Sequence, residues 1–179
     1  GLGDVYKRQI YNKGNWQGGS NTMRDEILES YSNVPKLMEK VAIFGALSKD
    51  ELKVVMGSMT LKKFEKGDTI FEQGGSPEYI NIIEQGIVKL IHEENGIRTE
   101  VRTLEVGDCF GETALLGILP YTVTAIAMTE VFLLQMSKFM FHNLLKVDPK
   151  LFSKFLLNIT REICRRNSSY EKILQHNFD

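Results

Sequence analysis

The sequence lacks the residues on which several classes of protein depend. Its two cysteines, Cys109 and Cys164, lie far apart and outside any C-x-x-C spacing, so neither a zinc site nor a disulfide framework is predicted. A reducing cytoplasm is therefore the expected compartment. His92, His142 and His176 show no metal-binding pairing, and no nucleophile motif occurs. We predict no metal, no cofactor and no catalytic residue, and hence not an enzyme.

Net charge and long apolar runs are also missing. The 22 basic and 23 acidic residues nearly cancel, which gives no overall attraction to nucleic acid or to an anionic membrane. The uncharged run at 113–129 contains Gly117 and Pro120 and is too short for a transmembrane helix. No membrane or nucleic-acid partner is predicted. A chain of 179 residues, of which 42% are hydrophobic, is expected to form one globular domain.

The N-terminal residues divide into two parts. The first methionine is Met23, and residues 1–22 are rich in Gly and Asn without any period, so we interpret them as a non-native or disordered leader. Residues 23–59 are predicted to form the N-terminal helices. Ser48 followed by Glu51 has the pattern of a capping box, which predicts a helix over 52–59.

Between residues 60 and 136 the apolar period changes to two, which is typical of strands. Asn95-Gly96 is a strong hairpin signal, and the Gly-Asp pairs at 67–68 and 107–108 predict turns. Many short strands with regular turns favour a β-roll or jelly roll. The predicted fold is therefore mainly β with flanking helices, and the expected strands span 60–65, 69–72, 79–84, 87–92, 97–104, 121–127 and 130–136.

Residues 137–179 return to helical periodicity, with one helix from Ser137 to Lys146 and a long one from Asp148 to about Gln175. Apolar positions of the long helix alternate steps of four and three, as in a coiled-coil seam. We predict a homodimer through this helix, with a polar break at Arg166; the alternative is a helix packed within one chain. The seam residues are Phe152, Leu156, Ile159, Ile163, Arg166, Tyr170 and Ile173.

Residues 110–127, FGETALLGILPYTVTAIA, carry the strongest indication of function. Gly111 permits close approach of a ligand to the backbone, and Glu112 places a carboxylate at a helix start. Thr113 and Ala114 supply amides at the N-terminus of that helix, which attracts anions. Together with GDTIFEQGG and YINIIEQGIVKL earlier in the chain, the segment resembles the cyclic-nucleotide-binding domain family, from about Val41 to the C-terminus.

The resemblance implies a phosphate-binding cassette at 110–123 and cAMP or cGMP as the ligand. It implies that Glu112 accepts from the ribose 2'-hydroxyl, while the amides of Thr113 and Ala114 hold the phosphate. Tyr121, followed by Thr122, stands where the family has the arginine that pairs with the phosphate. Losing a charge-assisted hydrogen bond of about 1.5–3 kcal/mol predicts cyclic-nucleotide binding weakened by about tenfold to a few hundredfold.

Two residues of the cassette have alternative interpretations. Glu112 is either a ligand residue or a carboxylate that stabilises a helix N-terminus. Tyr121 either fills the pocket with its ring or hydrogen-bonds a different ligand. Five polar residues of the long helix are candidates to contact the purine, which the family caps with this helix, namely Arg165, Arg166, Asn167, Ser168 and Ser169.

The predicted function is that of a stand-alone regulatory domain that senses a small anionic ligand. The first alternative is a degenerate domain that binds no small molecule and serves dimerisation or partner docking. The second is the sensory half of a transcription factor without its helix-turn-helix, for which we expect no room before Asp179.

Overall fold

A computed structural model describes the backbone of residues 41–176 and the side chains of residues 41–168. The leader predicted at 1–22 and the helix expected within 23–40 lie outside these residues.

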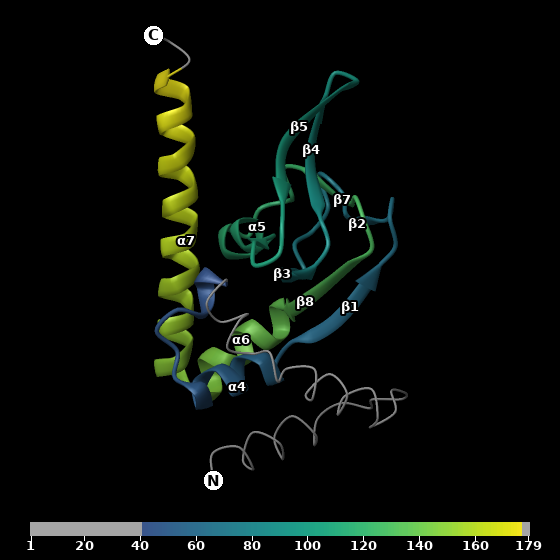
Figure 1. The fold of residues 1–179 in the computed structure, drawn as a ribbon. Coiled ribbons are helices and arrows are strands. Elements are labelled where there is room, and N and C mark those ends of the chain that lie inside the picture. The colour runs from purple at the N-terminus through teal and green to yellow at the C-terminus, as the bar shows by residue number, and fades with distance from the viewer. Residues whose placement is uncertain (1–40, 177–179) are drawn as a thin grey trace.

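Eight strands of the described residues form two four-stranded antiparallel sheets, which confirms the predicted β-roll. One sheet has the strand order β1-β8-β3-β6 and the other β2-β7-β4-β5. In Figure 1 the β4–β5 hairpin projects beyond the rest of the two sheets. The strands are β1 (Thr60–Phe64), β2 (Thr69–Phe71), β3 (Tyr79–Gln85), β4 (Val88–Glu94), β5 (Ile97–Leu104), β6 (Cys109–Phe110), β7 (Thr124–Ala127) and β8 (Val131–Ser137).

The predicted turns have the expected backbone geometry. Asn95 and Gly96 both have positive φ, at 53° and 77°, as a two-residue hairpin of this kind requires. The two Gly-Asp turns share one hydrogen-bond pattern: Asp68 accepts from the Glu65 amide at 2.9 Å, and Asp108 accepts from the Glu105 amide at 2.9 Å. The two Gly-Asp pairs therefore form turns of the same geometry.

The helices flank the roll at one end and along one side (Figure 1). Ser48 and Glu51 form the predicted capping box at the start of α4, and Pro149 opens α7, where its missing N–H costs no helical hydrogen bond. The helices are η2 (Ala42–Phe44), α4 (Lys49–Gly57), α5 (Glu112–Gly117), α6 (Lys138–Val147) and α7 (Pro149–His176).

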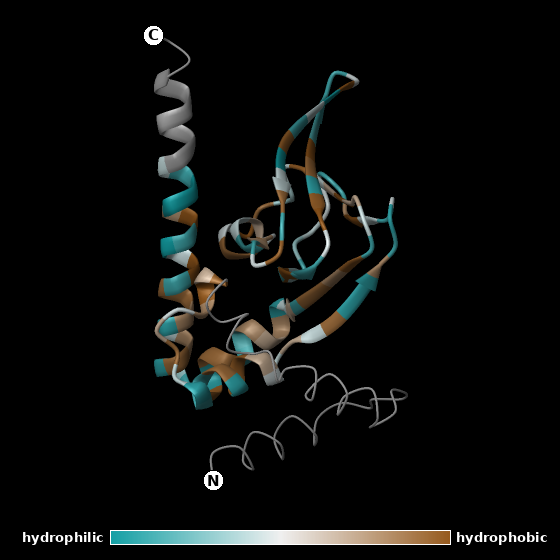
Figure 2. Ribbon diagram, viewed as in Figure 1, coloured by the Kyte–Doolittle hydropathy of each residue, from teal (hydrophilic) through white to brown (hydrophobic). Residues whose placement is uncertain are grey.

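Two apolar cores follow from the alternation of side chains along the strands. Ile83 and Leu133 point between the two sheets, whereas their neighbours Ile82 and Leu134 point toward the helices. The core that contains Ile82 and Leu134 joins α4, α6 and α7 to the β1-β8-β3-β6 sheet. In Figure 2 the hydrophobic colouring accordingly runs along β8 and through α6 and α4. The roll and its flanking helices therefore form one packed unit.

The described part of the α7 face that was assigned to a dimer seam contacts the chain's own core, and the side chains of Tyr170 and Ile173 lie outside the described residues. Ile159 is fully buried there, and Leu156 and Ile163 pack against the same core. The buried amide of Asn158 also donates to the carbonyls of Ile43 and Gly45 in and after η2. Ile159 is thus unavailable to a second copy, so placing this residue at a dimer interface was wrong. The heptad period identified an apolar face but not the surface that covers it.

Glu51 connects α4 to α7, and we expect this link to be sensitive to acid. Its carboxylate accepts from Lys154 Nζ at 2.8 Å, and this hydrogen bond is the main reason why the pKa of Glu51 is lowered from 4.5 to about 2. Stabilisation by this group is therefore present above about pH 4.5 and is lost as the pH falls toward 2.

We predict that Glu51→Gln, which keeps the cap, lowers the free energy of unfolding at pH 7 by about 0.5–1 kcal/mol, since the pair is partly exposed. The difference from wild type should shrink at pH 3. Urea unfolding of both proteins at the two pH values measures it, and an equal difference at both would contradict the assignment to Lys154.

Candidate cyclic-nucleotide site

Within the cassette, Gly111 adopts φ 84° and caps the N-terminus of the short helix α5. A Cβ at this position would lie 2.8 Å from the carbonyl oxygen of Tyr79 and 3.0 Å from Asn81 Nδ2, so the backbone passes closely over β3. The helix ends at Ile118, a β-branched residue in the left-handed region at φ 52°. These bounds agree with the short helix that the sequence analysis expected after Gly111.

The sequence analysis predicted a strand that begins at Tyr121, but in the structure this residue lies in a loop. Its amide donates to the Gly75 carbonyl at 2.9 Å, and its carbonyl accepts from the Gly74 amide at 2.7 Å. These bonds pair two loops, and β7 starts only at Thr124. Tyr121 is consequently held where its side chain enters the roll.

The ring of Tyr121 fills the space beside Gly111. It stacks on Phe71 with ring centroids 3.8 Å apart and an angle of 8° between the planes. Its hydroxyl accepts from the Glu78 amide at 3.3 Å, and the residue is only 6% exposed. Burial raises the pKa of the Tyr121 phenol. The ring thus lies where the first interpretation of this residue places it, and a hydrogen bond from the phenol to a ligand stays a prediction.

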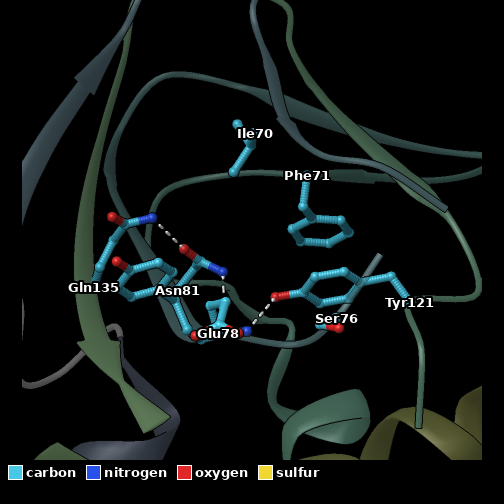
Figure 3. Close-up of a pocket in the computed structure, with 8 residues that line it drawn as sticks. Ile70, Phe71, Ser76, Glu78, Asn81, Tyr121 and Gln135 are labelled. Atoms are coloured by element: carbon cyan, nitrogen blue, oxygen red, sulfur yellow. Dashed lines mark hydrogen bonds between the residues drawn. The ribbon is translucent and has the colours of Figure 1, made fainter. Parts of the chain in front are cut away.

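A cavity of about 150 Å³ remains beside this ring, smaller than the roughly 300–1,000 Å³ of usual ligand pockets. Figure 3 shows Tyr121 and Phe71 on one side and Asn81 and Gln135 on the other. The residues that line it are Ile70, Phe71, Ser76, Glu78, Tyr79, Asn81, Tyr121 and Gln135. None of them carries a positive charge, so the lining offers no ion-pair partner to a phosphate.

Asn81 and Gln135 form a buried amide pair that the sequence analysis missed. Gln135 Nε2 donates to Asn81 Oδ1 at 2.8 Å, while Asn81 Nδ2 lies 3.4 Å from the Phe110 carbonyl oxygen. The two residues face each other across the β3–β8 ladder. The available indication was a polar residue inside the otherwise apolar run of β3, because a buried amide needs a partner.

Glu112 turns away from the cavity and binds α7. Its carboxylate is paired with the guanidinium of Arg166, and its Oε1 also accepts from the Thr113 hydroxyl at 3.3 Å. The side chain of Glu112 is 2% exposed, and that of Arg166 is 17% exposed. Arg166 donates a second hydrogen bond, 2.8 Å long, to the Cys109 carbonyl. The pair thus joins the start of the cassette to the long helix.

The electrostatics of this cluster favour the charge of Arg166. Burial of the guanidinium opposes its charge, but Glu112, Cys109 and Glu162 together outweigh burial, and the pKa of Arg166 is raised. Burial raises the pKa of the neighbouring Cys109 thiol well above its usual range, and Glu112 adds to the effect. Arg166 Nε is buried without a hydrogen bond and lies 3.7 Å from Glu162 Oε1.

The remaining candidate residues lie in different surroundings. The Ala114 carbonyl accepts from the Leu119 amide at 3.0 Å and so closes the end of α5. Thr122 is exposed, and its carbonyl lies 2.9 Å from His92 Nδ1. Arg165 pairs with Glu162 on the same helix. The structure therefore brings Tyr121 to the cavity and places Gly111 against Tyr79 and Asn81, which line it. Glu112 binds α7, whereas Thr113 and Thr122 are exposed.

Asn167 and Ser168 are exposed on α7, and the side chain of Ser169 lies outside the described residues. Among the polar candidates whose side chains are described, Arg166 donates hydrogen bonds to the carboxylate of Glu112 in the cassette and to the Cys109 carbonyl. Within residues 41–176, no group of at least three His, Cys, Asp or Glu side chains is placed to hold a metal ion, and no helix is long and apolar enough to cross a membrane.

Comparison with known proteins finds similarity over the roll and its cassette. The family model of the cyclic nucleotide-binding domain matches residues 61–148. The similarity to this family thus extends over the roll, the cassette and α6. Among curated relatives, the cAMP-dependent protein kinase regulatory subunit of Eremothecium gossypii is 31% identical over 117 residues, which cover 65% of this chain and 25% of the relative. The chain thus spans about a quarter of the length of such relatives.

Solved structures share the fold of this chain. A cyclic nucleotide-binding domain from Methylobacillus flagellatus has a TM-score of 0.72 at 21% identity and covers 82% of this chain and 84% of its own. The regulatory subunit of a cAMP-independent protein kinase A from Trypanosoma brucei has a TM-score of 0.65 at 20% identity and covers 82% and 51%. That structure is of a variant in which one of three substitutions introduces an arginine, and it is bound to cAMP.

Proposed function

We propose that this chain is a non-catalytic regulatory domain that senses a small anionic ligand at the cassette, with cyclic nucleotides bound at reduced affinity. The observation that carries this proposal is the ring of Tyr121, which occupies the cavity beside Gly111, where no Lys or Arg lines the wall. A cyclic phosphate that enters there meets backbone amides but no cation. The cytoplasm is the proposed compartment.

The choice of a nucleotide as ligand rests on kinship and on the cassette backbone. The curated relatives include regulatory subunits of cAMP-dependent protein kinases. Gly111 keeps the conformation that lets a ligand approach the chain, and Glu112 follows it directly. Both features support a ribose and phosphate site that is closed by Tyr121 in the described state.

Calorimetric titration of the purified protein with cAMP, cGMP and cyclic dinucleotides tests the proposal, with adenosine as the control that lacks the phosphate. We expect weak binding of cAMP or cGMP, and weaker binding of adenosine, because the amides of the cassette favour an anion. Submicromolar binding of cAMP would contradict the importance given to Tyr121. Binding of adenosine equal to that of cAMP would contradict an anionic ligand.

A second candidate is a module for dimerisation or partner docking that binds no small molecule. The stacked and buried ring of Tyr121 favours it, because a filled pocket needs no ligand. Leu157 is 53% exposed on α7, on the side away from the core that covers Ile159. A homodimer along α7 would have to use this side.

Sedimentation equilibrium tests the homodimer. We expect the wild type to be dimeric at tens of micromolar and Leu157→Asp to be monomeric, because the charge would be buried at the interface. Lys150→Glu is a control that changes charge at an exposed position in the first turn of the same helix. A monomeric wild type would contradict the α7 dimer.

A further inference from the structure

We propose that Asn81 is a ligand-binding residue of the cavity, whose side-chain amide donates a hydrogen bond to an oxygen of the cyclic phosphate, and that Gln135 holds this amide in position. The proposal rests on the function proposed above, since it needs a phosphate in the cavity. It goes further because it names a neutral donor on β3, outside the cassette, that partly replaces the missing cation.

The position of the Asn81 amide connects the cavity to the cassette. Asn81 lines the cavity and is 1% exposed. Its Nδ2 lies 3.4 Å from the carbonyl oxygen of Phe110, and a Cβ on Gly111 would lie 3.0 Å from the same nitrogen. A polar group of the cavity wall thus lies directly beside the first residues of the cassette, where a phosphate is proposed to approach the backbone.

The orientation of the amide is fixed by its neighbours. Gln135 Nε2 donates to Asn81 Oδ1 at 2.8 Å. On the other side of the amide, the carbonyl oxygens of Tyr79 and Phe110 each lie 3.4 Å from Asn81 Nδ2. An amide turned the other way would place its oxygen against two carbonyl oxygens and its NH2 group against the NH2 group of Gln135. The side of Asn81 next to the cassette is therefore the donor side.

The donor capacity of Asn81 is not fully used by the protein. Both contacts of Nδ2 are 3.4 Å long, whereas N–H···O hydrogen bonds usually measure about 2.7–3.2 Å. A ligand oxygen at the usual distance would replace a weak contact by a stronger one, and a charged oxygen would strengthen it further. Asn81 is thus able to bind an anion without carrying a charge of its own.

Tyr121 offers a second donor at the same cavity. Its hydroxyl accepts from the Glu78 amide, and this bond leaves the proton of the phenol available to a ligand. Figure 3 shows the amide nitrogen of Asn81 and the hydroxyl of Tyr121 pointing toward one another across the cavity. Two neutral donors that converge in this way suit a ligand group with more than one acceptor oxygen, as a phosphate has.

The alternative is that the amide pair only stabilises the fold. The double variant Asn81→Leu with Gln135→Met separates the two interpretations, because it replaces both partners by apolar side chains of similar size and leaves neither amide buried alone. Asn81→Leu by itself is expected to be less stable than the double variant, since Gln135 Nε2 would lose its acceptor. Thermal unfolding of both variants checks that the double variant keeps the fold.

Calorimetry with cAMP and adenosine on the wild type and the double variant tests for direct contact. We expect the double variant to lose about tenfold in affinity for cAMP and to keep its affinity for adenosine, which lacks the phosphate. Unchanged binding of cAMP would overturn the proposal. An equal loss for both ligands would also overturn it and leave Asn81 as a residue that only positions the cassette.

Nuclear magnetic resonance gives an independent readout. In protein labelled with isotopic asparagine, the side-chain signal that is absent from the double variant is that of Asn81. We expect this signal to shift as cAMP binds and to shift much less at equal saturation with adenosine. A wild type that binds cAMP without a shift would overturn the proposal and leave the proposed function intact, whereas a wild type that binds no cAMP would overturn the proposed function and with it the ligand of Asn81.

Discussion

Arg166→Met is expected to lower the free energy of unfolding by about 3–5 kcal/mol, because it leaves the carboxylate of Glu112 buried without its counter-charge. Glu112 is 2% exposed, and its other contacts are the Thr113 hydroxyl and a long contact from the Cys109 thiol at 3.7 Å. Neither supplies a charge. Methionine keeps most of the apolar volume of the arginine stem, so the loss isolates the charge from the packing.

The matched control is Arg165→Met, one position earlier, where the side chain pairs with Glu162 at the surface and the expected loss is about 0–1 kcal/mol. The double variant Glu112→Gln with Arg166→Met should recover most of the stability, since a neutral amide is much cheaper to bury than a carboxylate. Urea unfolding of the wild type, Arg166→Met, Glu112→Gln and the double variant gives the coupling energy. Losses that simply add in the double variant would contradict a buried ion pair.

The parts of the fold that depend on local patterns were predictable. Asn95-Gly96 specifies its hairpin because both positions require positive φ, and Ser48 with Glu51 specifies the start of α4 because the two residues satisfy each other's amides. The alternation of apolar residues identified seven of the strands. The two-residue strand β6, Cys109–Phe110, is too short to show a period and was missed.

The pairing of Arg166 with Glu112 was not predictable from local patterns. The two residues are 54 positions apart, and the heptad period of α7 shows which residues share a face but not which surface meets them. The same limit applies to Ile159, which the seam assigned to a partner and which the chain's own core covers. A charged residue on an otherwise apolar face was the available indication, and it was interpreted as a break in a dimer seam.

The cassette was located by its sequence, but the orientation of its side chains was not. Glycine at 111 and the helix after it were expected, whereas the direction of the Glu112 carboxylate depends on Arg166, which the motif does not contain. The outcome for Tyr121 depends on Phe71, because a ring can fill a pocket only where another apolar surface receives it. The orientations of the Glu112 and Tyr121 side chains thus both depend on contacts between segments that are distant in the sequence.

Tyr121→Arg is expected to strengthen cAMP binding by about 1.5–3 kcal/mol, or about tenfold to a few hundredfold in Kd, because it supplies a cation for the phosphate. The position suits an arginine. Its backbone is fixed by two hydrogen bonds to Gly74 and Gly75, and a guanidinium can stack on Phe71 as the phenol does. Calorimetry with cAMP on wild type and variant measures the change, with adenosine as the ligand that should gain nothing.

Tyr121→Gln separates the two consequences of this substitution, since it removes the ring and opens the cavity without adding a charge. If the ring is the main obstacle, the glutamine variant will gain as much affinity as the arginine variant, and the argument from charge will be wrong. If the missing cation is the main obstacle, only the arginine variant will gain, and its gain will fall at high salt because ions screen a partly exposed pair. Should neither variant bind cAMP, the filled pocket is a permanent feature, and the docking module becomes the better account of this domain.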